Sequence, residues 1–574
     1  MNGITKRWLM PQDPQAGGDL LERILAARGL DDPDDRAAFL SPDLKLLTES
    51  NPLSGIETAT DILLESIREK RPIVIYGDYD VDGITATSIL WHVIRTIDSD
   101  ALISTYVPHR LDEGYGLNPE AIRALHQDGA RTIITVDCGV TAVEEARLAR
   151  ELGLELIITD HHRAREDGEL PDAAAIVHPS LPGKEHEFTE LAGAGVAWKI
   201  ALHLARKACG SDDVGPALRN ALMDALSLSA MGTIADVMPL QDENRIIASF
   251  GLRHMSGCRN TGVQALLRAA GAGKGRNDAE MVGFRLGPRL NAAGRMGHAA
   301  SAIELFTTAD DMRAEELAHE LTELNTQRQA VEKSMIAQAR EMAIEQGMTE
   351  PGSHAIVLRH EDWHPGVVGI VCSRLVEMFG RPTILMQDDG EFCRGSARSI
   401  AGYSIHEALG ACDEHLETYG GHHMAAGMTV SSGSFDDFAT SLIRHANDSI
   451  PESHLMPELK IDLEVQRNEI SSTAIRKLSA MKPFGRGNPG PRVLLNNMRV
   501  LTAMAFGRSD DHLKLRLGAE DEKSKPIEAI WWGQAERLGE IRQRCVHVVG
   551  KMDIDTYSKR ESLVIDDIAM VSGS

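Results

Sequence analysis

The sequence lacks any apolar run close to the roughly 20 residues that a transmembrane helix needs. Its first eight residues, MNGITKRW, contain no apolar core of the kind found in signal peptides. Cysteine is scarce, with 7 residues scattered along 574 positions and no Cys-x-x-Cys pair. These absences argue against membrane insertion and a disulfide framework, and they predict a cytoplasmic protein with reduced thiols that does not associate with membranes.

Positive charge is also in short supply, because 60 Lys and Arg residues stand against 85 Asp and Glu residues, a net charge of −25. Taken alone, this balance argues against a protein that coats nucleic acid. It does not exclude an enzyme with a local basic groove. With 574 residues, of which 43% are hydrophobic and 25% charged, the chain is long enough for three or four domains with substantial cores.

Three aspartates follow a short hydrophobic run that starts at Ile73 and is typical of a buried strand. They occupy alternate positions: Asp78, Asp80 and Asp82. Carboxylates this close repel one another unless a cation lies among them, so the spacing favours a metal site over an acidic surface turn. An EF-hand is excluded, because the twelfth position counted from Asp78 is Ile89 rather than Glu and the preceding element is a strand.

Strand and helix patterns then alternate, which predicts right-handed crossovers and a parallel sheet. The expected strands after the first span 102–107, 132–136 and 154–158, and the expected helices span 56–69, 85–96, 119–127 and 142–152. Asp137 and the Asp160-His161-His162 triplet each follow a strand, so they are expected to converge with the first aspartates at the carboxyl edge of the sheet. Asp236 follows an apolar helical segment and by itself is equally consistent with a turn or a helix cap.

Aspartates combined with one or two imidazoles suit Mn²⁺, which accepts both oxygen and nitrogen ligands. A calcium site would use oxygen alone, and a structural zinc site would favour cysteine. Five or six carboxylates exceed the needs of one ion, so we expect two. A pair of ions roughly 3.5–4 Å apart lowers the pKa of a bridging water and braces both reacting oxygens. The pattern therefore predicts metal-assisted hydrolysis of a phosphoester or phosphoanhydride.

Two glycine-rich segments carry arginine and are expected to be loops. Residues 108–116 contain Arg110, and residues 287–295 contain Arg289 and Arg295. Guanidinium groups pair with phosphate oxygens, although such segments are equally consistent with plain turns. The Gly-Ala-Gly run at 193–195 is interpreted as close helix packing, because no full dinucleotide-binding fingerprint follows it.

A long helical pattern at 310–346 predicts a helix that bridges two domains, with a coiled-coil dimer as the alternative. A second α/β pattern follows, with strands at 355–358 and 382–386 and a helix at 366–379. Its polar candidates are Ser396 and Arg398, interpreted as a phosphate clamp, and His422 and His423. For the two histidines, contacts to phosphate or base are favoured over metal ligation.

After residue 451 the pattern changes to short β-like runs at 459–465, 492–501, 512–517, 527–532, 546–554 and 562–568. A small antiparallel barrel of the OB type fits this pattern. Such barrels bind single-stranded nucleic acid through basic and aromatic side chains. The candidates for this role are Phe484, Arg486, Lys514, Arg516 and Trp531.

Taken together, these motifs resemble the DHH phosphoesterase superfamily and, more closely, the RecJ-type single-stranded-DNA exonucleases, over nearly the whole chain. The first five matching motifs are YGDYDVDG (76–83), EGYG (113–116), VDCG (136–139), DHH (160–162) and AGAGV (192–196). The next five are IADVMPL (234–240), PRLNAAGR (288–295), GSARS (395–399), GGHHMAAG (420–427) and PFGRGNP (483–489). Ten motifs in the same order make the resemblance specific.

The resemblance implies an α/β protein with a parallel-sheet DHH phosphoesterase domain, a smaller α/β DHH-associated domain and a C-terminal OB-fold barrel. The expected divisions are an N-terminal segment (1–50), the DHH domain (51–308), a connecting helix (309–348), the DHH-associated domain (349–450) and the OB domain (451–574). The implied activity is 5′-to-3′ hydrolysis of single-stranded DNA to 5′-mononucleotides in recombination and repair. The residues by themselves do not reveal the polarity.

Site residues are carried over by motif position. One Mn²⁺ is expected at Asp82, Asp137, His161 and Asp236, and a second at Asp78, Asp80 and Asp137, with Mg²⁺ as a possible substitute. His162 is expected to orient the site or to contact the scissile phosphate. The residues expected to hold the 5′ end are Arg110, Ser396 and Arg398, and those expected along the DNA path are Arg289, Asn291 and Arg295. His422 is expected to contact a phosphate or a base of the substrate.

The family resemblance also suggests a monomer that works with a single-stranded-DNA-binding protein and a RecQ-type helicase. One rival is a DHH enzyme that acts on nanoRNA or cyclic dinucleotides, but such enzymes usually lack a C-terminal barrel. A catalytically inactive RecJ-like binding subunit would have lost the metal aspartates, which this chain retains. A manganese pyrophosphatase would need neither the barrel nor the arginine-bearing loops.

Overall fold

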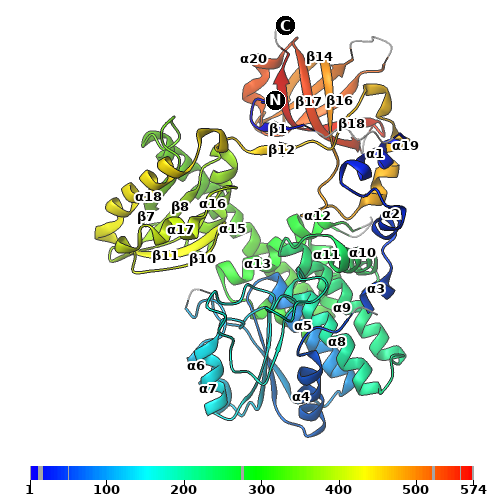
Figure 1. Ribbon diagram of the computed structural model, residues 1–574, viewed down its shortest axis with the longest axis vertical. Helices are drawn as coiled ribbons and strands as arrows, with labels where there is room; N and C mark the ends of the chain where they lie inside the picture. Colours follow the sequence, from blue (N-terminus) through cyan, green and yellow to red (C-terminus); the bar gives the residue numbers. More distant parts are fainter. Residues whose placement is uncertain are drawn as a thin grey trace. The chain divides into compact units, whose positions relative to one another are not determined.

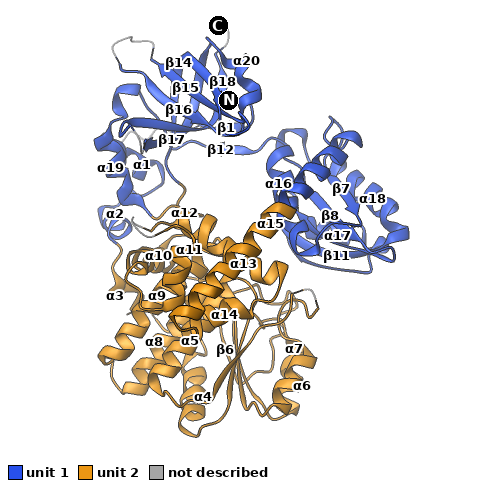
Figure 2. Ribbon diagram, turned by 180° about the vertical axis from the view of Figure 1, so that it is seen from behind, with its two compact units in different colours: residues 1–41, 332–482, 490–574 blue, residues 42–331, 483–489 orange. Residues whose placement is uncertain are grey.

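A computed structural model describes residues 2–10, 17–48, 51–110, 112–272, 277–519, 524–555 and 558–571. Leu111 of the arginine-bearing 108–116 segment lies outside these residues. The chain forms two compact units (Figure 2): unit 1 comprises residues 1–41, 332–482 and 490–574, and unit 2 comprises residues 42–331 and 483–489. The long helix α15 (Asp311–Glu345) passes from one unit to the other between Val331 and Glu332.

Unit 2 is built on a five-stranded sheet that is parallel, as predicted, although its fifth strand was not predicted. Its order is β3 (Ile103–Tyr106), β2 (Ile73–Gly77), β4 (Thr132–Val136), β5 (Glu155–Thr159) and β6 (Ala175–Val177). Because all five strands run the same way, the residues that follow β2, β4 and β5 lie at one edge. The topology therefore brings Asp78, Asp137 and the Asp-His-His triplet together.

Alternate side chains of the central strands enter two separate cores. Ile73 and Ile75 pack with α4 (Ile56–Arg68), α5 (Val81–Ile97) and α8 (Gly193–Cys209). Val74 and Tyr76 belong to the opposite core, with α6 (Pro119–Gln127) and α7 (Val143–Glu151). Figure 1 shows these two sets of helices on opposite faces of the sheet. Burial on both faces explains why the strands read as continuous apolar runs.

The remaining helices of unit 2 cover the α5 and α8 side. They are α3 (Leu44–Thr48), α9 (Pro216–Ala235), α10 (Asp242–Met255), α11 (Thr261–Ala269), α12 (Ala279–Met281), a π-helical turn (Val282–Leu286), α13 (Gly287–Met296) and α14 (Ala300–Thr307). The loop prediction for 287–295 is therefore wrong, because these residues form α13. Pro288 at the first turn is compatible with a helix, and a Cβ atom on Gly294 would lie 2.8 Å from the Tyr79 carbonyl oxygen.

Unit 1 contains a second α/β sheet in the order β10 (Thr418–His422), β11 (Ala425–Ser431), β9 (Phe392–Arg398), β8 (Thr383–Asp388) and β7 (Ile356–His360). Only β7 and β8 pair in parallel. The helices of this sheet are α16 (Pro365–Phe379), α17 (Ile405–Gly410) and α18 (Phe435–Ser449). The predicted strand–helix–strand pattern corresponds to β7, α16 and β8.

The C-terminal strands close into the predicted barrel. Its order is β14 (Arg492–Phe506), β15 (His512–Gly518), β16 (Ile527–Trp531), β18 (Glu561–Met570) and β17 (Cys545–Ile554), and β17 pairs back to β14. The sequence predicts an antiparallel barrel, but β16 and β18 run parallel to each other. The predicted strand at 459–465 is two short strands, β12 (Glu458–Lys460) and β13 (Leu463–Glu464). The barrel unit also carries α19 (Ser472–Leu478) and α20 (Leu538–Ile541).

The N-terminal segment, for which the sequence offers no role, packs on the barrel. Strand β1 (Arg7–Leu9) pairs with β12, and the helices α1 (Leu20–Ala27) and α2 (Pro33–Leu40) follow it. The buried carboxylate of Asp567 accepts hydrogen bonds from the Trp8 indole and from the backbone and hydroxyl of Thr5. The described residues of this segment up to Ser41 are therefore a structural part of unit 1, whereas α3 belongs to unit 2.

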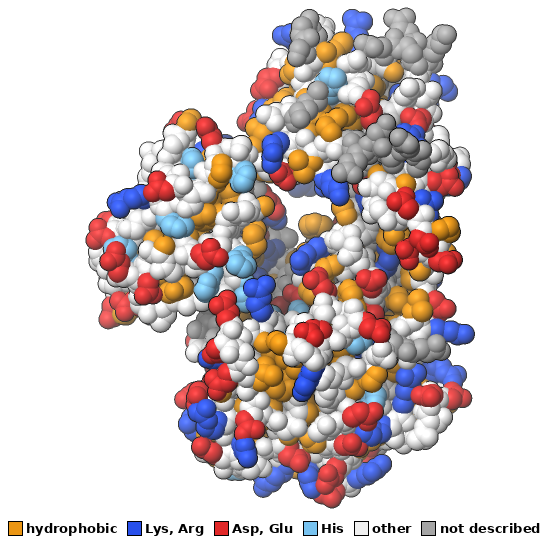
Figure 3. All heavy atoms as spheres, in the orientation of Figure 1, with side chains coloured by type: hydrophobic (Ala, Val, Ile, Leu, Met, Phe, Trp, Pro, Cys, Tyr) orange, Lys and Arg blue, Asp and Glu red, His pale blue; other side chains and the backbone are white. Residues whose placement is uncertain are grey.

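Among the described residues, no helix is both long enough and apolar enough to cross a bilayer. In Figure 3, Lys and Arg side chains are interspersed with Asp and Glu over each unit on the visible face. The net negative charge is thus compatible with local positive regions.

Candidate metal centre

The turn after β2 places three carboxylates at the N-terminal end of α5. Asp80 is the N-cap of α5, and its Oδ1 accepts hydrogen bonds from the backbone N–H groups of Asp82 (2.8 Å) and Gly83 (3.2 Å). A Cβ atom on Gly83 would lie 2.6 Å from the backbone nitrogen of Asp78, so only glycine allows this tight turn. Asp78 and Asp82 are buried. The local fold thus directs the carboxylates of Asp78 and Asp82 into the protein interior.

The turn after β4 is strained at Asp137, whose φ of 64° lies in the left-handed region. A non-glycine residue in this region costs on the order of 1–2 kcal/mol, which the surrounding structure must offset. The Asp137 backbone carbonyl accepts a hydrogen bond from the Tyr115 hydroxyl at 3.0 Å. Such strain is concentrated at functional sites, and here it directs a buried carboxylate toward the end of β5.

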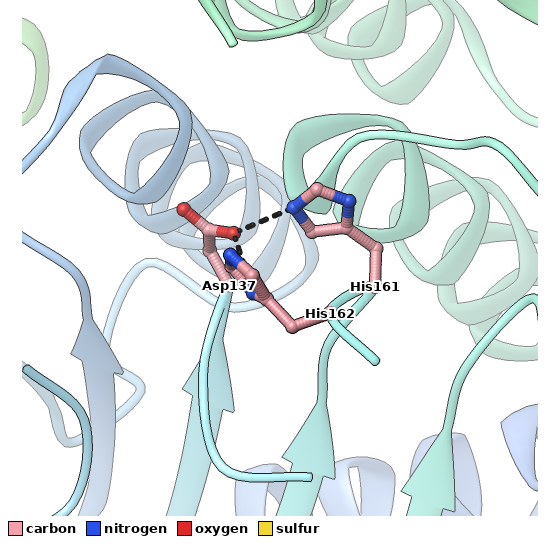
Figure 4. Close-up of side chains that lie close together, drawn as sticks. All are labelled: Asp137, His161 and His162. Carbon is pink, nitrogen blue, oxygen red and sulfur yellow. Dashed lines mark ion pairs between the residues drawn. The ribbon is translucent and has the colours of Figure 1, made fainter. Parts of the chain in front are cut away.

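Figure 4 shows Asp137, His161 and His162 facing one another across the ends of β4 and β5. The His161 Nε2 atom lies 3.0 Å from Asp137 Oδ1 and 3.6 Å from carboxylate oxygens of both Asp82 and Asp236. Donor atoms within 4.8 Å of one another form three groups: Asp82–His161–Asp236, Asp78–Asp80–Asp137 and Asp137–His161–His162. The structure therefore brings together all seven predicted site residues of this centre, and Asp137 joins the two sides.

The Asp82 carboxylate is held by the N-terminus of α8, which sequence reasoning missed. The backbone N–H groups of Gly193 and Ala194 donate to its two oxygens at 2.6 and 2.9 Å. A Cβ atom on Gly193 would lie 2.8 Å from Asp137 Cβ, and one on Gly232 would lie 2.4 Å from Asp82 Oδ1. The interpretation of 193–195 as helix packing was therefore incomplete. The run also positions a carboxylate.

Asp160 lies next to the ligand groups and holds the two histidines through hydrogen bonds. Its Oδ1 accepts hydrogen bonds from the backbone N–H groups of His161 and His162 and pairs with His162 Nδ1 at 2.8 Å, while Oδ2 accepts from the Val140 backbone N–H. The Tyr115 hydroxyl lies 3.0 Å from the same His162 nitrogen. Tyr115 was missed as a candidate, although the Glu-Gly-Tyr-Gly motif marks it. Asp160 and Tyr115 together fix the orientation of the His162 ring.

Burial and mutual repulsion make this cluster unstable as a set of bare carboxylates. Burial and the Asp80 charge raise the pKa of Asp82 to about 7. Burial and the charges of Asp82 and Asp80 raise the pKa of Asp236 to about 8. The pKa values of Asp78 and Asp137 are also raised, chiefly by burial. A nearby cation is the physical means of keeping all of them ionised.

The two adjacent histidines differ in charge. Burial and repulsion by His162 lower the pKa of His161 to about 3, so this imidazole is neutral and its Nε2 lone pair is available. Although burial opposes protonation of His162, its hydrogen bond to Asp160 and the charge of that carboxylate raise its pKa to about 9. His161 thus has the form of a metal ligand, and His162 has the form of a cationic donor.

Unpaired buried atoms show that the residues present fit metal ions. Within the described residues, Asp78 Oδ1, Asp137 Oδ1 and His161 Nε2 are buried and make no hydrogen bond. Leaving such atoms unpaired costs about 1–3 kcal/mol each, more for charged groups. Carboxylate oxygens with one imidazole nitrogen form a donor set suited to Mn²⁺, and the oxygens alone suit Mg²⁺.

Two residues that are expected to contact DNA, Asn291 and Arg110, lie beside the turn between β2 and α5. Asn291 Oδ1 accepts a hydrogen bond from the Val81 backbone N–H at 3.1 Å, so its amide supports the turn. The Arg110 guanidinium lies over the Tyr79 ring, 4.7 Å from its centroid. Arg289 donates to the Thr322 hydroxyl and the Arg285 carbonyl, while the positive charge of Arg295 acts on Tyr79.

The predicted phosphate clamp lies on β9 in unit 1. Ser396 and Arg398 occupy alternate positions and therefore share one face of the strand, next to α16. A Cβ atom on Gly369 would lie 3.1 Å from Arg398 Nη2 and 3.4 Å from Ser396 Oγ. His422 lies exposed on β10, and His423 Nδ1 pairs with Ser404 Oγ at 2.8 Å.

The nucleic-acid candidates of the C-terminal region are only partly placed as expected. Lys514 and Arg516 are exposed on β15, but Trp531 is only 2% exposed and faces the barrel core, so it is not available for base stacking. The neighbouring Trp532 is 52% exposed and forms an aromatic cluster with Phe506 and His512, with centroids 4.7–5.7 Å apart. Phe484 and Arg486 belong to unit 2 rather than to the barrel.

Comparison with known proteins covers every part of this architecture. The model of the DHH family, N-terminal domain, matches residues 72–231, the DHHA1 domain matches 352–448, and the RecJ OB domain matches 461–566. The chain is 34% identical to the single-stranded-DNA-specific exonuclease RecJ of Escherichia coli (strain K12), over 96% of this chain and 95% of that protein. The chain belongs to the RecJ family. The predicted family and fold class are thereby confirmed.

Other RecJ proteins show the same similarity. The RecJ exonuclease of Bacillus subtilis (strain 168) is 38% identical over 96% of this chain and 68% of its own length. The crystal structure of RecJ in complex with Mn²⁺ from Thermus thermophilus superposes with a TM-score of 0.81 at 30% identity, over 96% of this chain and 76% of that one. A second structure of that RecJ contains Mg²⁺. Both metals named from the sequence thus occur in RecJ structures.

Proposed function

We propose that this chain hydrolyses single-stranded DNA from the 5′ end and releases 5′-mononucleotides with the help of two divalent metal ions. The observation that carries the proposal is the pair of ligand groups joined at Asp137, within a chain that matches RecJ exonucleases along almost its whole length. The match includes the C-terminal barrel, which nanoRNA-type rivals lack. The metal aspartates are all present, unlike in an inactive binding subunit.

The ligand sets follow from the donor groups. Asp82, His161 and Asp236 would hold one ion and Asp78 with Asp80 the other, and Asp137 would contact both. Bound there, the metal ions supply Lewis-acid charge and a water of lowered pKa. The N-terminus of α8 orients Asp82, and its two amide hydrogen bonds oppose the rise in the pKa of this carboxyl group. Buried walls around Asp78 and Asp137 exclude bulk water and strengthen these interactions.

His162 places a positively charged side chain of the protein directly beside the proposed ligand groups. Asp160 and Tyr115 hold its ring, and its raised pKa keeps it protonated at neutral pH. We assign His162 the role of donating a hydrogen bond to a non-bridging oxygen of the scissile phosphate, where negative charge grows during displacement. Protonation on one ring nitrogen is maintained by Asp160, which leaves the other available to substrate.

Substrate binding is assigned to groups outside the ligand set. Arg110 with Tyr79 offers a planar surface for a terminal base, and Arg289 and Arg295 offer charge to the DNA backbone. His422 is retained as a phosphate or base contact. A single-stranded-DNA-binding protein and a RecQ-type helicase as partners, a monomeric state and a cytoplasmic location are proposals that follow from the family resemblance alone.

The test of this function uses single-stranded DNA labelled at either the 5′ or the 3′ end, with Mn²⁺ supplied. We expect immediate release of a labelled mononucleotide from the 5′-labelled strand and progressive shortening of the 3′-labelled strand. Binding without shortening would favour the binding subunit instead. Attack restricted to very short oligomers would favour the nanoRNA-type enzyme, and release of phosphate from pyrophosphate alone would favour the pyrophosphatase.

A 5′-phosphate clamp at Ser396 and Arg398 leads to a separate prediction. Arg398→Ala should raise KM for 5′-phosphorylated strands about 10- to 100-fold, because a charge-assisted hydrogen bond contributes about 1.5–3 kcal/mol. The same variant should change KM for strands with a 5′-hydroxyl much less. Equal effects on both substrates, measured in parallel steady-state assays, would remove this residue from the clamp. Arg444→Ala, on α18 of the same unit, serves as the matched control.

The barrel leads to another prediction, which concerns the exposed Trp532 and not the buried Trp531. Stacking of a base on an aromatic ring contributes about 1–3 kcal/mol, so Trp532→Ala should weaken binding of single-stranded DNA about 10-fold. Fluorescence anisotropy with a labelled oligonucleotide in EDTA measures binding without hydrolysis. Lys514 and Arg516, on the adjacent strand β15, should add a salt-dependent contribution. Unchanged affinity in Trp532→Ala would exclude the aromatic cluster as a DNA surface.

A further inference from the structure

One short segment of the C-terminal half folds with the metal-binding unit. Residues 483–489 belong to unit 2, although the residues on either side of them belong to unit 1. The segment has its own fixed shape, because Gly485 and Asn488 exchange backbone hydrogen bonds and the buried Asn488 amide donates to the Pro483 carbonyl at 2.8 Å. We refer to these seven residues as the 483–489 turn.

The 483–489 turn packs on the chain that follows Asp236. The Leu240 backbone N–H donates to the Arg486 carbonyl at 2.8 Å, and the Gln241 side-chain amide donates to the Gly487 carbonyl at 3.2 Å. The approach is close, because a Cβ atom on Gly485 would lie 2.7 Å from Leu240 Cδ1. A side chain at position 485 would therefore force the buried Leu240 side chain to shift.

The segment between Asp236 and Leu240 is held by α9 at its start, where the backbone N–H groups of Val237 and Met238 donate to carbonyl groups of the last turn of that helix. Asp236 ends α9, and Val237 follows with a φ of 57°, a strained conformation for a β-branched residue. One end of the segment is fixed by α9 and the other by the 483–489 turn. The positive charge of Arg486 also acts on the Asp236 carboxylate and opposes the rise in its pKa.

We propose that the 483–489 turn is a positioning element of the metal centre: it holds the Asp236 carboxylate beside Asp82 and His161, and its Arg486 sets the local charge. The inference rests on the proposed metal-dependent function. It changes the role expected from the sequence, in which these residues contact DNA as part of the barrel. Binding of metal by the DHH domain thus depends on a segment that lies just before the first barrel strand.

Two substitutions should change Mn²⁺ affinity in opposite directions. Gly485→Val drives a side chain into Leu240, displaces the turn and releases Asp236, so Mn²⁺ should bind about 10-fold more weakly, as for loss of a supporting contact to a ligand. Arg486→Gln removes a cation that repels the metal and leaves the glycines in place, so Mn²⁺ should bind about 3-fold more tightly. A purely structural role would not produce an increase in affinity.

The experiment titrates Mn²⁺ into the metal-free full-length chain by calorimetry, without DNA. Gly539→Val and Arg542→Gln, exposed positions of the barrel unit, are the matched controls and should leave the affinity unchanged. Circular dichroism establishes that each variant is folded. Arg486→Gln needs no repacking, so it decides the question even where Gly485→Val does not fold.

Each outcome is decisive. Weaker binding by folded Gly485→Val together with tighter binding by Arg486→Gln supports the inference. Unchanged or weaker Mn²⁺ binding by Arg486→Gln overturns it, as does wild-type affinity in folded Gly485→Val. A wild-type chain that takes up no Mn²⁺ would instead overturn the proposed metal centre itself, so failure of the inference and failure of the proposed function are distinguishable.

Discussion

Asp137→Ala is expected to reduce release of 5′-mononucleotides by about 10³-fold or more. Asp137 is the residue common to both ligand groups, so its loss removes a donor from each proposed ion at once. Metal ions provide several kcal/mol of charge stabilisation in such displacements, and each 1.36 kcal/mol corresponds to a tenfold change in rate. The measurement is the initial rate on 5′-labelled single-stranded DNA at saturating Mn²⁺.

The control for this loss is a carboxylate outside the centre. Asp128→Ala removes an exposed aspartate after α6 in the same unit and should keep the wild-type rate. Asp137→Ala should still bind DNA, because the proposed arginine contacts are untouched. A variant that keeps more than a tenth of the wild-type rate would show that Asp137 does not connect two catalytic ions.

The convergence of the carboxylates could be predicted from the sequence because it depends only on strand direction. Asp78, Asp137 and Asp160 each follow a β-branched run, and a parallel sheet brings the ends of such runs to one edge. The position of Asp236 could not be obtained in this way. It lies after a helix, and only tertiary packing places it 3.6 Å from His161.

The supports of the centre were harder to predict than its ligands. The amide groups of Gly193 and Ala194 are backbone atoms, so no side-chain pattern identifies them as partners of Asp82. The left-handed conformation of Asp137 likewise cannot be read from the sequence, because aspartate adopts this region more often than most residues but only at a small fraction of its positions. Chemistry carried by side chains is therefore more visible in a sequence than chemistry carried by the backbone.

The prediction that Trp531 stacks on DNA is wrong for a simpler reason, which is the alternation of side chains along a strand. In β16 the side chains of Ile527, Ala529 and Trp531 face the core, which follows the period of two expected for a strand. Applying this alternation to the run would have placed Trp531 inside and the next residue, Trp532, outside. The alternation along the strand thus distinguishes the two tryptophans, whereas aromatic character does not.

Gly193→Ala is expected to lower exonuclease activity about 10- to 100-fold, the range typical of groups that orient metal ligands. The added methyl would lie 2.8 Å from Asp137 Cβ and 3.0 Å from an Asp82 oxygen. Asp137 Cβ is fixed by the backbone and the Asp82 carboxylate is held by two hydrogen bonds, so α8 or the two ligands must shift. Displacement of α8 would also weaken the two amide hydrogen bonds that hold Asp82.

A matched substitution lies two residues further along the same helix. A Cβ atom on Gly195 would meet only the side chains of Leu191 and Ile247, at 3.2 Å and beyond, so Gly195→Ala should keep at least half of the wild-type rate. Calorimetric Mn²⁺ binding should weaken in Gly193→Ala and not in Gly195→Ala. If both variants lost activity equally while binding Mn²⁺ normally, α8 would matter through packing alone, and its amide groups would have no part in holding the metal centre.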